Sequence, residues 1–270
     1  MKLISHTRQT MAESASRLAF GSTGSSSWPV WDRFLLLDDA PLMHIGNICE
    51  TCEFFFRHVG RKDVSSMSIA SVKAQLDSGV QSLDDGALPM GGVVPAGSYT
   101  VALFEVNPLL VRAGGPNDYF TQEQRLVWPV DPLDEGMAEA QYYRCGQRAL
   151  PGETMLFEFV IPLQDPRTLD PARVDHYRRL IQAGERPTAV AIGVLDTKAS
   201  TEYPCDSSGN EVVPKYPRHW CLANYLIDGH HKLAAAEAEG TPITLLSFIS
   251  DEASSLAVRD LVGAYLEDEP

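Results

Sequence analysis

The segment 221–240 changes from strand-like to helix-like character within a few residues. Its first seven residues are mostly apolar, which is typical of a buried strand. Asp228 and Gly229 then interrupt the strand, and the glycine permits a backbone conformation that a side chain would disfavour. Residues 233–238 are good helix formers, and a glycine and a proline follow them. The segment therefore predicts a buried strand that leads into a helix through a tight turn.

Imidazole and ammonium side chains gather at the predicted start of this helix, where His230, His231 and Lys232 follow one another. The first backbone N–H groups of a helix have no partner within it and favour an anion. The two histidines and the lysine would add donors and positive charge. The cluster therefore predicts a site for a phosphate group.

The residues Asp-Gly-His-His-Lys-Leu-Ala-Ala-Ala (228–236), with Gly-Thr-Pro-Ile (240–243) after them, resemble the signature turn of the ParB-like/sulfiredoxin superfamily. The resemblance covers residues 154–270. Over this range the expected order of strands and helices agrees with that of the superfamily, in addition to the motif. Two departures stand out. Lys232 occupies a position where arginine is commoner, and the two side chains hold phosphate differently. A long insert, 196–219, separates two strands that the superfamily joins more directly.

The chain is predicted to be α+β overall, with an α/β domain in its second half. It is expected to divide into three parts. Residues 1–27 end in a stretch rich in Ser, Gly and Ala and are expected to form a flexible N-terminal arm. Residues 28–153 are expected to form an appended α+β region, with a helix at 68–83 and a strand at 98–106. Residues 154–270 are expected to form the mixed-sheet domain that the resemblance implies.

Further elements are expected at the strands 141–149, 154–163, 188–195 and 243–249 and the helices 170–182 and 253–266. The insert contains a strong turn at 207–210 and predicts a protruding hairpin. Two interpretations of this hairpin stay open. It either lies over the signature turn as a lid or is a plain surface excursion.

The resemblance carries a function with it. Members of the superfamily bind the phosphates of ATP, ADP or CTP at the signature turn. The free serine kinases among them carry Asp-Gly-His-His-Arg and transfer a phosphoryl group to a small hydroxyl substrate. The resemblance therefore implies that Gly229, His230, His231 and Lys232 hold the phosphates of a nucleotide bound with Mg²⁺. Phosphoryl transfer needs mainly charge neutralisation and in-line positioning, which such residues supply.

The implied catalytic residues are Asp228, His230 and a carboxylate on the helix 170–182. Asp228 would orient the loop, bind Mg²⁺ or take a proton from the acceptor. Asp170 is the first choice for the further carboxylate, with Asp175 and Glu185 as alternatives.

Three other functions are weighed against a small-molecule kinase. A non-catalytic nucleotide sensor would bind the nucleotide without turnover, with residues 28–153 docking a protein partner. Nuclease activity is disfavoured by the acidic charge. Sulfiredoxin chemistry is not expected, because His230 stands at the position that corresponds to the catalytic cysteine.

A Cys-x-x-Cys pair, Cys49 and Cys52, lies in the first half between His44 and His58. These four side chains could complete a tetrahedral Zn²⁺ site, and Cys145 could supply a ligand from a distance. Two other interpretations are open. The cysteines are small buried residues beside the phenylalanines that follow them, or they form a redox pair.

Composition narrows the partners and the compartment. The net charge is −14 and no long Lys/Arg-rich run occurs, so no nucleic-acid partner is expected. No apolar run has the length of a membrane span, and the first residues lack the apolar stretch of a signal peptide. Five cysteines do not suggest a disulfide framework. These features favour a cytoplasmic protein. The resemblance implies that its partners are a nucleotide and a small-molecule substrate.

Overall fold

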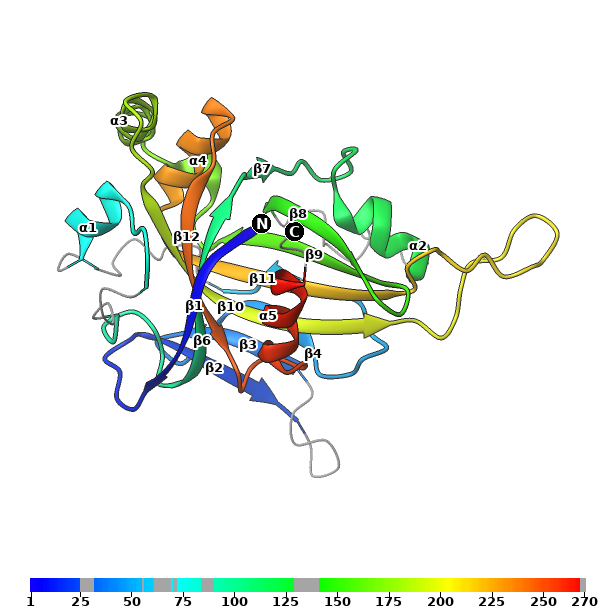
Figure 1. Ribbon diagram of the computed structural model, residues 1–270. Helices are drawn as coiled ribbons and strands as arrows, with labels where there is room; N and C mark the ends of the chain where they lie inside the picture. The colour runs from blue at the N-terminus through cyan, green and yellow to red at the C-terminus, as the bar shows by residue number, and fades with distance from the viewer. Residues whose placement is uncertain are drawn as a thin grey trace.

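The computed structural model describes residues 1–24, 32–54, 56–60, 69, 72–83, 90–128 and 141–267. Over these residues the chain forms two β-sheets and a set of helices that pack on the larger sheet (Figure 1). Strands and helices are mixed along the chain, so the predicted α+β class is confirmed.

The larger sheet contains strands from both halves of the chain. Its order is β1 (Lys2–Met11), β6 (Gly97–Val106), β12 (Ile243–Ser250), β10 (Thr188–Ala199), β11 (Arg218–Asp228), β9 (Thr154–Pro162), β8 (Tyr143–Leu150) and β7 (Leu109–Leu110). The pairs β10–β12 and β9–β11 are parallel, and the other pairs are antiparallel. Strand β10 therefore lies in the middle, which agrees with its almost wholly apolar sequence.

The smaller sheet is antiparallel and comes entirely from the first half. Its order is β2 (Leu18–Thr23), β3 (Asp32–Leu37), β4 (Ala40–Asn47) and β5 (Arg57–His58). A buried ion pair joins it to the larger sheet, since both guanidinium NH groups of Arg33 donate to the carboxylate of Asp196, at 2.8 and 2.7 Å.

The longer helices all belong to the second half. They are α3 (Pro171–Gln182), α4 (His230–Glu239) and α5 (Val258–Leu266), with the short α1 (Lys73–Ser78), η1 (Phe120–Gln124), α2 (Arg125–Val127) and η3 (Pro166–Thr168) elsewhere. Asp170 caps α3, because its side chain accepts a hydrogen bond from the backbone N–H of Ala172. Helices α1, α3 and α4 gather at one end of the larger sheet (Figure 1).

Strand β10 shows how the sheet separates two apolar cores. Val190, Ile192 and Val194 belong to the core shared with the smaller sheet. Ala191 and Leu195 belong to the core beneath α3, α4 and α5. Successive side chains of a strand point to opposite faces, so one apolar strand contributes to both cores.

The predicted division into three parts is corrected by the pairing of β1. Residues 2–11 are not part of a flexible arm, because they pair with β6 along the whole strand, and residues 18–23 form β2. The last residues of the expected arm, 25–27, lie outside the described residues. The boundary predicted at residue 154 falls in the hairpin between β8 and β9, within one continuous sheet.

The insert between β10 and β11 points away from the signature turn. Strand β10 begins beside α4 and runs to Ala199, and β11 returns from Arg218 to Asp228. The connecting residues, 200–217, therefore lie at the opposite end of this hairpin, where the loop extends from the molecule (Figure 1). The lid interpretation is wrong, and the insert is a surface excursion. No helix in the described part of the chain is long and apolar enough to span a membrane.

Candidate functional site

The signature turn needs glycine at its corner. Gly229 has a φ of 95° and begins α4 in the left-handed conformation. A Cβ at this position would lie 2.7 Å from the Cβ of Ala189, which is closer than packed atoms allow. No side chain in the described part of the chain caps the N-terminus of α4. Its first N–H groups are therefore left for solvent or a ligand.

A pocket of about 290 Å³ lies at this turn. It is lined by Gln164, Thr168, Asp170, Arg173, Tyr177, Ile227, Asp228, Gly229, His230, His231 and Lys232. Apart from Ile227 and Gly229, every one of these residues has a polar side chain. The structure thus brings together the predicted cofactor-binding residues and the predicted catalytic residues on one polar surface.

The two histidines are held as neutral hydrogen-bond acceptors at one ring nitrogen. Nε2 of His230 accepts from the backbone N–H of Gln164 at 3.1 Å, and Nε2 of His231 accepts from that of Asp170 at 3.2 Å. The ring proton of each neutral histidine then lies on Nδ1. Burial lowers the pKa of His230 to about 3 and also lowers the pKa of His231. The prediction that the two histidines carry positive charge is therefore wrong, and their rings are neutral donors.

Lys232 is buried and already paired. Its Nζ donates to the carbonyl of Thr188 at 3.0 Å and lies 3.0 Å from Oδ1 of Asp77 and 3.4 Å from Oδ2 of Asp228. The Tyr177 ring lies beside it, with 5.6 Å between Nζ and the ring centroid. The lysine therefore joins the turn to its surroundings, and two carboxylates balance its charge.

Helix α1 contributes a group that the sequence did not reveal. Asp77 accepts from Lys73 at 2.8 Å and from the Tyr177 hydroxyl at 2.9 Å, besides its contact with Lys232. Burial alone would raise the pKa of Asp77, but hydrogen bonds from Lys73 and the charge of Lys232 lower it. The first half of the chain thus reaches the signature turn, although no local signal in residues 73–78 indicates it.

Arg173 is the second residue that sequence reasoning missed. It lies in the first turn of α3, it is exposed, and it lines the pocket. Among the described residues it forms no ion pair, unlike Lys232. Residues three apart lie on the same face of a helix, so Arg173 lies on the face of the N-cap Asp170. This spacing is the sequence signal that could have identified Arg173.

The predicted carboxylates separate into two groups. Asp228 and Asp170 both line the pocket. Asp175 lies 3.4 Å from Arg178 on the exposed side of α3, and Glu185 is exposed beyond the end of that helix. Neither of these two lines the pocket. Asp170 is therefore the carboxylate of α3 that the structure places at the site.

The two histidines among the four predicted zinc ligands have other partners. Nε2 of His44 lies 3.0 Å from Oδ1 of Asp32, and Nε2 of His58 lies 3.3 Å from the carbonyl oxygen of Pro162. Cys49 and Cys52 stay close to each other, but no group of three or more His, Cys, Asp or Glu in the described residues is arranged to hold a metal ion. The donor set does not fit a tetrahedral zinc site, and we derive no function from zinc.

Comparison of the chain with protein-family models, curated proteins and solved structures returns no match. The likeness to the ParB-like/sulfiredoxin superfamily therefore depends on the signature turn and on the order of elements from β9 to β12. That order is strand, helix, two strands, helix and strand.

Proposed function

We propose that the pocket at the signature turn binds the phosphate groups of a nucleotide. The observation that carries the proposal is the uncapped start of α4, which opens into a pocket with an almost wholly polar lining. Unpaired N–H groups at a helix N-terminus favour an anion, and polar side chains around them add further donors. The same turn carries the sequence resemblance.

Each residue of the pocket contributes differently to phosphate binding. The backbone N–H groups of residues 230–232 and the Nδ1–H groups of His230 and His231 are neutral donors. Arg173 supplies the positive charge, because Lys232 is already balanced by two carboxylates. A guanidinium presents a planar set of donors that matches a phosphate.

Asp228 and Asp170 are suited to bind Mg²⁺ and to contact the acceptor. Mg²⁺ usually binds one or two carboxylates together with the phosphates of its nucleotide, and the pocket offers two. The metal would neutralise phosphate charge there. We propose that Asp228 accepts the proton of a small hydroxyl substrate while the substrate oxygen bonds to the terminal phosphorus of ATP. The bond between that phosphorus and the ADP oxygen breaks and ADP leaves, so the protein would be a small-molecule kinase. The non-catalytic nucleotide sensor stays the alternative.

The first test is isothermal titration of ATP, ADP and CTP, each with Mg²⁺, into the full chain. We expect Arg173→Ala to weaken binding about tenfold or more, since hydrogen bonds to charged groups contribute about 1.5–3 kcal/mol. Arg179→Ala is the matched control, because Arg179 lies on the same helix but does not line the pocket. The double variant His230→Ala, His231→Ala should abolish binding.

Two outcomes would contradict the proposal. One is that no nucleotide binds the wild-type chain. The other is that Arg173→Ala and Arg179→Ala bind equally well. Circular dichroism of the histidine variant shows whether lost binding reflects lost folding, and Arg173 is exposed enough for its variant to stay folded.

A second test separates the kinase from the sensor. The protein is incubated with ATP, Mg²⁺ and a panel of small hydroxyl compounds, serine first, and products are followed by ³¹P NMR. A kinase gives a new phosphate ester that Asp228→Asn does not form. Binding without any ester in the panel supports the sensor.

A further inference from the structure

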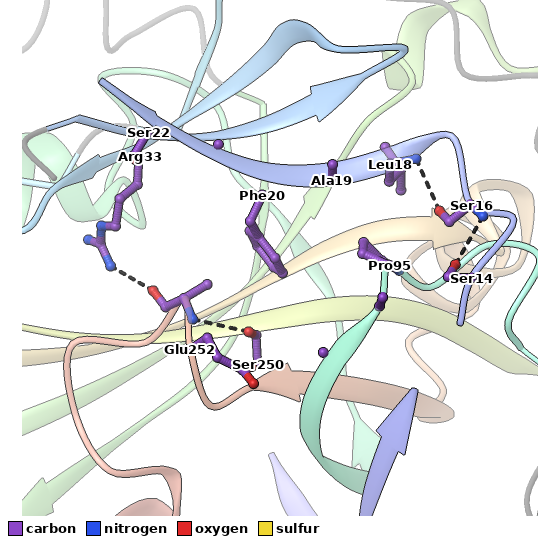
Figure 2. A pocket seen from close by; sticks show the side chains of 14 residues that line it. Ser14, Ser16, Leu18, Ala19, Phe20, Ser22, Arg33, Pro95, Ser250 and Glu252 are labelled. Atoms are coloured by element: carbon purple, nitrogen blue, oxygen red, sulfur yellow. Dashed lines mark hydrogen bonds between the residues drawn. The ribbon is translucent and has the colours of Figure 1, made fainter. Parts of the chain in front are cut away.

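A second hollow, of about 620 Å³, lies beside β2 (Figure 2). We call it the β2 groove. All five residues from Leu18 to Ser22 line it, and the opposite wall comes from residues 95–97, 250, 252 and 253. Side chains of a strand alternate between two faces, so a hollow on one face would be lined by every second residue. The β2 groove therefore runs along the edge of the strand.

This edge has unpaired backbone groups. Within the described residues, strand β2 is the outermost strand of the smaller sheet and pairs with β3 alone. The carbonyl of Arg17 accepts from the N–H of Asp38, so the backbone groups of Arg17 face β3. Because these directions alternate in an antiparallel pair, Phe20 and Ser22 direct their N–H and C=O groups away from β3. No partner for them occurs among the described residues.

The side chains of the β2 groove are mostly apolar or already bonded. Phe20 points into the space between β2 and the opposite wall, which includes Pro95 (Figure 2). The guanidinium of Arg33 is held by Asp196 and by backbone carbonyls. Glu252 accepts from the N–H of Ser98 and has no cationic partner among the described residues. The groove thus combines a free strand edge, an apolar lining and one exposed carboxylate.

We propose that the β2 groove binds an extended peptide segment of another protein, which adds to β2 as a further strand. Free backbone groups along an edge supply hydrogen bonds to such a peptide, and the lining selects its side chains. The lining calls for an apolar side chain against Phe20 and Pro95 and a Lys or Arg beside Glu252. Because walls flank both sides of the groove, a single extended chain fits it better than the edge of a folded sheet.

The test begins with selection of binding sequences from a phage-displayed library of linear hexapeptides, using the full chain. We expect enrichment of sequences that alternate aliphatic residues with Lys or Arg. The best peptide is then synthesised with a fluorophore, and its affinity is measured by fluorescence anisotropy. Failure to enrich any sequence, or enrichment of acidic peptides, would overturn the proposal.

Two variants examine the wall and the edge. Ser22→Pro removes an N–H that faces the groove and leaves the bonds to β3 intact, so the peptide should bind about fivefold more weakly. Glu252→Gln should weaken binding of peptides with Lys or Arg but not of neutral ones. Val213→Pro and Glu202→Gln, both in the exposed insert, are the matched controls and should bind as the wild type does. Equal affinity of all variants would overturn the proposal.

The peptide itself offers a test that needs no change in the protein. Single N-methylation along the backbone should abolish binding at alternate positions only, because a peptide strand directs every second N–H toward β2. Unchanged affinity at every methylated position would show docking by side chains alone. Analytical ultracentrifugation tests whether a second copy of this chain occupies the groove instead. A dimer that Ser22→Pro dissociates would place that copy on β2. Either result would overturn the proposal.

Discussion

Replacing Asp77 by Asn should destabilise the protein measurably, because this carboxylate joins α1 to the buried Lys232. The side chain of Lys232 is 2% exposed, and Nζ lies 3.0 Å from Oδ1 of Asp77. A charge-assisted hydrogen bond of this kind contributes about 1.5–3 kcal/mol. The contact with Lys73 adds less than about 1 kcal/mol, since half of the Lys73 side chain is exposed. We expect a total loss of about 2–3 kcal/mol.

Urea unfolding at neutral pH measures this loss, and thermal melting should show a decrease of about 5–10 °C. The pH dependence gives a second check. The pKa of Asp77 is lowered in the folded protein, so its ionised form stabilises the fold above the ordinary pKa of aspartate. The difference between wild type and Asp77→Asn should therefore shrink as the pH falls below about 4.

Asp175→Asn is the matched control, because Asp175 lies 3.4 Å from Arg178 with 64% of its side chain exposed. Its stability should stay within about 0.5 kcal/mol of the wild type. Equal stability of the two variants at neutral pH would refute the reasoning. A deficit of Asp77→Asn that persists unchanged at low pH would also refute it, since it would then not depend on charge.

Three further predictions concern the turn, the histidines and the cysteines. Gly229→Ala should cost more free energy of unfolding than Gly240→Ala, because both glycines have positive φ but only the first would place a Cβ against Ala189; equal losses in urea titrations would argue against the close approach. His230 should stay neutral in ¹H–¹⁵N spectra down to about pH 4. The pKa of His230 is lower in the folded protein than in the unfolded chain. This histidine should therefore lower the free energy of unfolding by about 1.4 kcal/mol per pH unit as the pH drops below about 6.5. A ring that titrates near pH 6 would contradict the burial of His230. Elemental analysis should find well under one equivalent of zinc in the purified protein, and a full equivalent lost in Cys49→Ser would restore the zinc site.

Local signals in the sequence predicted the elements around the signature turn correctly. An apolar run, the Asp228-Gly229 break and a set of helix formers correspond to β11, the turn and α4. Asp170 caps α3 as its position before Pro171 indicates. These features depend on neighbouring residues, so one sequence carries enough information about them.

The remaining features depend on contacts between distant residues. The sequence near Lys2 does not show that β1 pairs with β6, and the sequence of α1 does not show that Asp77 meets Lys232. The charge of the histidines was predicted wrongly for the same reason. Burial by the surrounding chain, which lowers the pKa of His230, is a tertiary effect that residue identity does not reveal.

Strand β12 has a consequence for biosynthesis, because it pairs with β6 on one side and with β10 on the other. A nascent chain that has not yet reached Ile243 can form the β1–β6 pair and the strands from β8 to β11, but each of these assemblies has an open edge. Unpaired edges of this kind favour aggregation. A ribosome that pauses shortly before Ile243 would prolong the exposure of the open edges of β6 and β10. Codon choice just before Ile243 should therefore influence the yield of folded protein more than codon choice in segments translated earlier.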